Sequence, residues 1–87
     1  MKVKFCGLTS LADSLAAVEA GADLLGFNFY PPSPRYITPR NCARIILELR
    51  SRGMQVATVG VFVNAPVDEL LKIMVSCRLD LAQLSGD

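Results

Sequence analysis

The hydrophobic positions of this chain alternate between two patterns, short apolar runs and apolar residues at helical spacing. The runs lie at 3–6, 22–30, 54–63 and 80–84, and each is followed by glycine, proline, asparagine or serine. Runs of this length that end at turn residues are typical of β-strands. The third run is almost wholly apolar and rich in β-branched residues, which predicts a strand covered on both faces in a parallel sheet.

Between the runs, apolar residues recur every three or four positions and predict three helices. Ser10 is the expected N-cap of the first, which ends at or before Gly21. The second spans 39–52, with Thr38 as its N-cap and a proline at the first helical position. The third begins near Pro66. The predicted buried stripes are Leu11, Leu15, Val18 and Ala22; Cys42, Ile45, Ile46 and Leu49; and Val67, Leu70, Leu71 and Met74.

Strand and helix thus alternate three and a half times, with a period of about 20–30 residues. Right-handed βαβ crossovers then give an α/β fold with a parallel sheet. The repeat is one of architecture and not of sequence, which favours an α/β unit over a solenoid. We expect residues 1–87 to form one domain.

Composition excludes several classes of protein. Hydrophobic residues make up 52% of the chain and charged residues 20%, with a net charge of +1, which fits a globular protein. The charges are interspersed, whereas a nucleic-acid surface needs a one-sign patch. No apolar run approaches the ~20 residues of a membrane span, and no signal peptide is visible. The three cysteines fit neither a metal knuckle nor a disulfide framework, so we expect reduced thiols in a cytoplasmic protein.

Polar residues follow all four predicted strands. Parallel strands bring their carboxyl ends to one edge of the sheet, and ligands of such folds bind at that edge. The edge is expected to gather a thiol, a guanidinium, amides and a carboxylate, a combination that suggests a site without naming a reaction. The residues concerned are Cys6, Gly7 and Thr9; Asn28 and Arg35; Asn64; and Gln83, Ser85 and Asp87.

Each of these residues has more than one interpretation. Cys6 is either a proton-transferring or nucleophilic thiolate or a small buried hydrophobic residue, and composition alone favours the second. Arg35, in a proline-rich loop, suits a carboxylate or phosphate but is equally explained as a solvated cation. Asn28 and Asn64 fit ligand contact or local hydrogen bonding. The other two cysteines lie on or beside helical stripes and are expected to be structural, and Asp87, at the end of the chain, is a poor acid.

Four blocks of the sequence occur in order: Lys4–Thr9, Gly26–Tyr30 with Ser33–Tyr36, Val59–Asn64, and Gln83-Leu84 with Gly86. Together they closely resemble phosphoribosylanthranilate isomerase. The resemblance covers essentially all 87 residues and corresponds to three βα units and the fourth strand of an eightfold barrel. It implies a TIM (β/α)8 fold, here as a partial barrel of about three and a half units.

The family catalyses the Amadori rearrangement of N-(5-phosphoribosyl)anthranilate to 1-(2-carboxyphenylamino)-1-deoxyribulose 5-phosphate in tryptophan biosynthesis, without metal or organic cofactor. The resemblance implies that Cys6 is the general base and that Arg35 holds the anthranilate carboxylate. Gln83 and Ser85 match a substrate-binding block in which the family usually has histidine at the position of Ser85.

The family's general acid follows the fifth strand, and its phosphate site follows the seventh and eighth, so neither has a counterpart in these 87 residues. We therefore expect the chain to be inactive alone and prone to self-association through open strand edges and inner apolar residues. Two alternatives stay open: a half-barrel binding or assembly module that docks with a separately encoded second half, and another sugar-phosphate-binding barrel. The inner residues expected to be exposed include some of Val3, Phe5, Phe27, Val59 and Val61.

Overall fold

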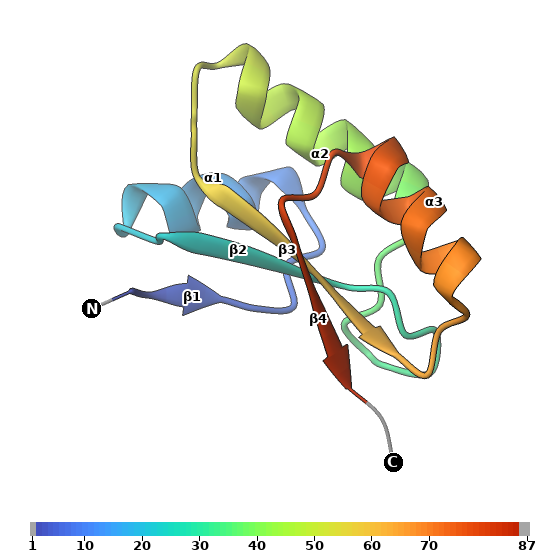
Figure 1. Ribbon diagram of the computed structural model, residues 1–87. Helices are drawn as coiled ribbons and strands as arrows, with labels where there is room; N and C mark the ends of the chain where they lie inside the picture. Colours follow the sequence, from blue (N-terminus) through green and yellow to red (C-terminus); the bar gives the residue numbers. More distant parts are fainter. Residues whose placement is uncertain (1, 86–87) are drawn as a thin grey trace.

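The computed structural model describes residues 2–85, in which three helices pack on one side of a four-stranded sheet (Figure 1). All strands are parallel and lie in the order β1-β2-β3-β4, so each βα unit places its next strand beside the last. This is the predicted α/β topology. The elements are β1 (Lys4–Phe5), α1 (Leu11–Glu19), β2 (Leu24–Asn28), α2 (Pro39–Ser51), β3 (Ala57–Val63), α3 (Val67–Cys77) and β4 (Leu81–Ser85).

Local sequence signals begin the first two helices as predicted. The side-chain oxygen of Ser10 accepts a hydrogen bond from the Asp13 N–H at 3.1 Å. Thr38 Oγ1 accepts one from the Asn41 N–H at 3.2 Å, and Pro39 takes the first helical position. Each cap satisfies a backbone N–H that the helix itself leaves without a partner.

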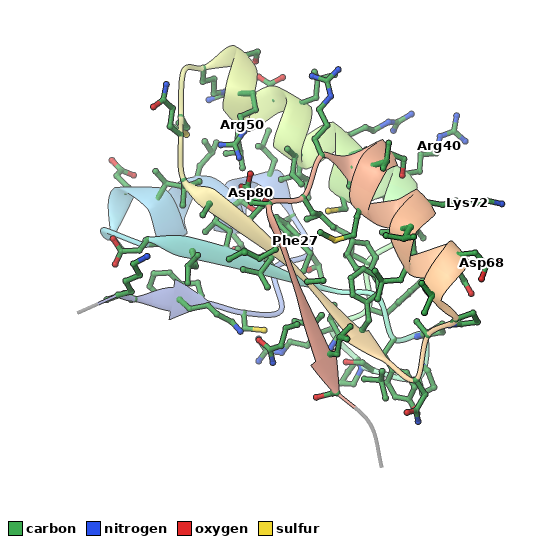
Figure 2. All side chains as sticks on the ribbon, viewed as in Figure 1. Phe27, Arg40, Arg50, Asp68, Lys72 and Asp80 are labelled. Carbon is green, nitrogen blue, oxygen red and sulfur yellow. The ribbon has the colours of Figure 1, made fainter. Side chains whose placement is uncertain are left out.

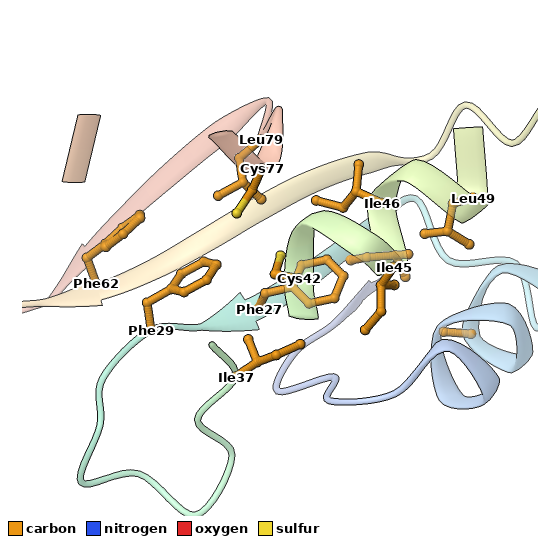
Figure 3. Packing of buried hydrophobic residues seen from close by; sticks show 12 residues of the cluster. Phe27, Phe29, Ile37, Cys42, Ile45, Ile46, Leu49, Phe62, Cys77 and Leu79 are labelled. Atoms are coloured by element: carbon orange, nitrogen blue, oxygen red, sulfur yellow. The ribbon is translucent and has the colours of Figure 1, made fainter. Parts of the chain in front are cut away.

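The core lies between the helices and the face of the sheet that they cover (Figure 3). Phe27 and Leu25 of β2 are fully buried there. The rings of Phe29 and Phe62 stack with their centroids 5.3 Å apart and join the ends of β2 and β3. The predicted stripe of α2 is confirmed, since Cys42, Ile45, Ile46 and Leu49 are all buried.

On α3 the buried stripe differs from the predicted one. Leu70 and Met74 pack against the core as predicted, together with Ile73. Val67 and Leu71 are instead 71% and 55% exposed. The prediction was wrong for these two residues because α3 carries apolar side chains on two faces, and periodicity does not decide which face meets the sheet.

The other face of the sheet, which carries no helix and is called the open face below, is better covered than expected. Phe27 was one of five residues of which some were expected to be exposed there. It belongs instead to the helix-covered face, because side chains alternate along a strand and this register turns Phe27 inward. Val59 and Val61 do lie on the open face, yet they are only 5% and 7% exposed, since β3 is flanked on both sides by other strands. Val3 and Phe5 are exposed, as expected, but Phe5 pairs with Leu25 and therefore belongs to the helix-covered face and not to the open face.

A polar network ties together the N-terminal ends of β3 and β4 (Figure 2). Asp80 Oδ2 accepts hydrogen bonds from the Thr58 N–H at 2.8 Å and from Thr58 Oγ1 at 3.1 Å, and Arg50 Nη2 contacts the same oxygen at 3.4 Å. Arg50 Nη1 donates to the carbonyls of Met54 and Val56. Those carbonyls bond to a side chain and not to a neighbouring strand, so β3 begins later than predicted.

Candidate functional site

The predicted site residues gather at the C-terminal edge of the sheet (Figure 1). Cys6 directly follows β1, Arg35 lies in the loop between β2 and α2, and Gln83 and Ser85 close β4. All four residues are exposed. Ser85 was predicted to begin a loop, but it is the last residue of β4. Asp87 lies outside the described residues.

The thiol of Cys6 lies against the backbone of β2. A Cβ atom built on Gly26 would stand 3.1 Å from Cys6 Sγ and 3.2 Å from Cys6 Cα, so the thiol uses space that any other residue at position 26 would fill. The Gly26 carbonyl accepts hydrogen bonds from the N–H groups of Gly7 and Leu8, at 3.0 and 3.1 Å, and fixes the turn after Cys6. Cys6 is exposed, so its interpretation as a buried hydrophobic residue was wrong.

The side chain of Arg35 reaches the same turn from the neighbouring loop. Gly7 has a φ of +80°, and a Cβ atom there would stand 2.5 Å from Arg35 Cδ and 3.2 Å from Arg35 Nη1. Ser33 shapes the loop: its Oγ accepts from the Arg35 N–H and its carbonyl from the Tyr36 N–H, both at 3.1 Å. Among residues 2–85, no carboxylate pairs with this guanidinium. Cys6 and Arg35 are therefore neighbours, separated by Gly7, and both are accessible.

A cavity of about 250 Å³ opens on the Arg35 side of Gly7. Its volume is below the roughly 300–1,000 Å³ of enclosed small-molecule sites, so it does not surround a ligand of that size. Its lining combines a cation, a carboxylate and a hydroxyl, groups suited to a polar ligand. Its lining residues are Gly7, Thr9, Asp13, Pro34 and Arg35.

Lys4 is a residue of this region that the sequence analysis missed. Its Nζ donates a hydrogen bond to Oε1 of Gln83, which joins the first and last strands across the open face. Lys4 precedes Cys6 by two positions, and strand alternation turns both side chains to the same face. That alternation was the signal that could have found it. An ammonium, a thiol and an amide thus share the open face near its C-terminal edge.

Asn28, Cys42 and Cys77 have structural roles. Asn28 Oδ1 accepts from the Tyr30 N–H at 2.8 Å, so local hydrogen bonding explains this residue. Cys42 and Cys77 are buried between α2 and α3, and the Cys77 thiol donates to the Pro39 carbonyl at 3.2 Å. Burial is the main cause, and the neighbouring Cys77 the second, that raises the pKa of the Cys42 thiol well above its ordinary value. Cys42 therefore stays protonated and inert, as predicted.

The described residues contain neither a cluster of metal ligands nor a membrane-spanning helix. Within residues 2–85, no three histidine, cysteine or acidic side chains come together as metal ligands would. No helix in the same span is long and apolar enough to cross a membrane.

Comparison with known proteins identifies close relatives. A family model described as N-(5'phosphoribosyl)anthranilate (PRA) isomerase matches residues 3–87. The N-(5'-phosphoribosyl)anthranilate isomerase of Citrifermentans bemidjiense is 55% identical over 86 residues, which cover 99% of this chain and 40% of the relative. The chain thus spans about 40% of the length of the curated relatives that it matches.

Solved structures agree with the sequence relatives. Monomers of the dimeric phosphoribosylanthranilate isomerase of Thermotoga maritima superimpose with a TM-score of 0.90 and 44% identity, over 99% of this chain and 42% of that one. A phosphoribosylanthranilate isomerase in complex with reduced 1-(o-carboxyphenylamino)-1-deoxyribulose 5-phosphate gives a TM-score of 0.93 and 45% identity, over 100% of this chain and 43% of that one.

Proposed function

Because this chain belongs to the phosphoribosylanthranilate isomerase family, we propose that it supplies the β1–β4 part of an active site that rearranges N-(5-phosphoribosyl)anthranilate in tryptophan biosynthesis. The observation that carries the proposal is the meeting of an exposed thiol and an unpaired guanidinium at one turn. In this proposal the barrel wall formed by residues 1–87 provides the base and the carboxylate clamp.

Cys6 is the proposed general base. Protonation of the ribose ring oxygen opens the aminal and leaves an iminium, which makes the hydrogen on C2 acidic. The Cys6 thiolate takes that proton, and the resulting enolamine becomes the ketone of the product. A base in this role has to be accessible and fixed in direction, and the exposed thiol held against β2 meets both requirements.

Arg35 is the proposed clamp for the anthranilate carboxylate. A guanidinium presents two parallel N–H donors to a carboxylate, which fixes the plane of the ligand as well as its position. The stem of Arg35 lies over Gly7, next to the proposed base, so a bound anthranilate ring would be held near the carbon that loses its proton. The loop that carries Arg35 is braced by Ser33, which limits the ordering needed on binding.

Gln83 and Ser85 are proposed substrate contacts from the far side of the open face. Gln83 already accepts a hydrogen bond from Lys4, so a ligand would meet an ordered amide. Ser85 lies where the family usually has histidine, and its shorter, uncharged side chain makes a weaker contact. The reaction breaks the ring C–O bond and moves protons within one molecule, with no external oxidant or reductant, so the proposal calls for no metal or organic cofactor. A cytoplasmic location is part of the same proposal, supported by three free cysteines.

The test is a chimeric barrel. Residues 1–87 would replace the matching segment of the Citrifermentans bemidjiense isomerase, so that the relative provides the acid and the phosphate-binding loops. We expect the chimera to restore growth of a tryptophan auxotroph that lacks the isomerase, and the Cys6→Ala chimera not to. Cys42→Ala, which removes a buried structural thiol, is the matched control and should still support growth. Growth of the Cys6→Ala chimera would remove Cys6 from the mechanism.

A second candidate is an assembly role, in which the chain pairs with a further copy or with a separately produced second half of a barrel. The observation that favours it is the exposure of Leu81 and Leu84 on β4, which is an unpaired edge. The dimeric state of the Thermotoga maritima relative is in keeping with self-association. Light scattering of residues 1–87, alone and with the second half of a relative, tests this role; a stable monomer in both samples contradicts it.

A further inference from the structure

We propose that Gly26 and Gly7 are positioning residues of this site, Gly26 for the Cys6 thiol and Gly7 for the Arg35 side chain. The proposal rests on the proposed function, because it assigns each glycine to one of the two groups that carry the chemistry. Room for a neighbouring side chain is a reason for glycine at both positions, and it is separate from turn geometry and strand pairing.

Gly26 lies in the middle of β2, where turn formation does not call for glycine. Its missing side chain would project onto the open face, where the thiol of Cys6 now lies. A methyl group there would stand 3.1 Å from Cys6 Sγ and 3.4 Å from Cys6 Cβ, tighter than ordinary van der Waals contact. It would also stand 3.2 Å from Cys6 Cα, so rotating the thiol away would not relieve the crowding. An alanine at position 26 therefore displaces Cys6 itself.

Gly7 combines two demands at one position. Its φ of +80° disfavours any side chain, and the space next to it is occupied by Arg35 Cδ and Nη1. A methyl group at position 7 would overlap Arg35 Cδ at 2.5 Å and push the long, exposed side chain aside. The backbone hydrogen bond from the Gly7 N–H to the Gly26 carbonyl, at 3.0 Å, connects the two glycines directly.

Two other glycines of the chain each show one of these features alone, a positive φ or crowding around the missing Cβ. Gly53 has a φ of +76° and nothing within 4 Å of its would-be Cβ, so alanine there adds backbone strain without touching a neighbour. Gly60 is crowded like Gly26, but by Leu79 and Phe62 on the helix-covered face, where a Cβ would stand 2.8 Å from each. Alanine at Gly60 therefore costs packing without touching the site. Each proposed positioning glycine thus has a matched control.

The first experiment compares Gly26→Ala with Gly60→Ala in the chimeric barrel. We expect Gly26→Ala to lower kcat at least threefold, since a displacement of about 1 Å in an active site costs up to 10²-fold and the crowding here calls for a shift of a few tenths of an ångström. KM should change much less. We also expect the rate of Cys6 alkylation by iodoacetamide, followed on its peptide by mass spectrometry, to change at least threefold. Gly60→Ala should lower Tm while leaving both kcat and the alkylation rate within twofold of the parent.

The second experiment compares Gly7→Ala with Gly53→Ala. We expect Gly7→Ala to raise KM at least tenfold and Gly53→Ala to leave it unchanged, although both place alanine at a positive φ. A double-mutant cycle sharpens the assignment: if Gly7 acts through Arg35, Gly7→Ala adds little to the KM of an Arg35→Ala chimera. Full additivity of the two changes, or an equal effect of Gly53→Ala, overturns the role of Gly7.

The two proposals fail in different ways. An inactive parent chimera with intact folding counts against the proposed function, and the alkylation comparison still tests whether Gly26 positions Cys6. An active parent whose kcat and Cys6 alkylation are unaffected by Gly26→Ala overturns the positioning role and leaves the function standing. A Gly60→Ala chimera that matches Gly26→Ala in every measurement reduces Gly26 to a packing residue.

Discussion

The two ends of the sheet use polar residues in opposite ways. At the N-terminal end, Asp80, Thr58 and Arg50 bond to one another, and Arg50 also bonds to two carbonyls of the loop before β3. At the C-terminal end, Cys6 and Arg35 are exposed, with the Cys6 thiol beside Gly26 and the Arg35 stem beside Gly7. The polar residues at the N-terminal end thus bond to one another, whereas Cys6 and Arg35 face outward.

This difference separates residues that hold the fold from residues that are free for a ligand. Polar groups that bond to one another within the protein stabilise strand register. A thiol or guanidinium whose stem is fixed while its end is free is prepared for binding. The same division is general in βα barrels, in which stability resides at the N-terminal end and chemistry at the C-terminal end. The predictions below test the two ends separately.

The largest effect is expected from Cys6→Ala in the chimeric barrel. Loss of a general base typically costs 10²–10⁴-fold, so we expect kcat to fall by about that factor. Because Cys6 is exposed, the free energy of unfolding should change by less than about 0.5 kcal/mol. Steady-state kinetics and urea unfolding measure the two quantities. A large loss of stability with this substitution would show that the two ends are not separate.

Arg35→Ala should follow, with an increase in KM of about 10–100-fold, because hydrogen bonds to a charged group contribute roughly 1.5–3 kcal/mol. Arg35→Lys keeps the charge and loses the planar fork, so its KM should fall between those of the parent and the alanine variant. Initial-rate measurements over a range of substrate concentrations distinguish the three proteins. Equal KM values for lysine and alanine variants would mean that charge plays no part.

Asp80→Asn tests the opposite end of the sheet. The change removes the charged acceptor of two hydrogen bonds from Thr58, and we expect a loss of about 1–2 kcal/mol in the free energy of unfolding with kcat unchanged. The contact with Arg50 contributes little of this, since both side chains are partly exposed. Glu48→Gln, which breaks the surface pair with Arg52, is the control and should cost less than about 0.5 kcal/mol. Urea unfolding measures both variants.

The smallest effect is expected from Ser85→His, which restores the residue usual in the family. An imidazole at the end of β4 can add one hydrogen bond to the substrate, so kcat/KM should rise by about 2–10-fold. Stability should hold steady, because Ser85 is exposed and only its backbone carbonyl, which accepts from the Asn64 N–H at 3.1 Å, has a structural role. A decrease in kcat/KM would show that the serine is adapted to its surroundings.

The sequence by itself determined the order of the elements and their approximate limits. The helix starts at Ser10 and Thr38, the buried stripe of α2 and the parallel arrangement of the strands were all predictable. Caps and apolar periodicity act over a few residues, so they can be read along the chain. The family motifs likewise lie within single strands and loops, which is why the resemblance was visible before any contact was known.

Only the tertiary structure decided which face of α3 meets the core and on which face of the sheet Phe27 lies. It also decided that Cys6 is exposed and that Lys4 bonds to Gln83. Lys4 and Gln83 are 79 positions apart, and such contacts depend on how three crossovers twist and curve the sheet. The role proposed for Gly26 belongs to the same class, because a missing side chain acquires meaning only from the neighbour that uses its space. No sequence pattern within a single strand or helix identifies that neighbour.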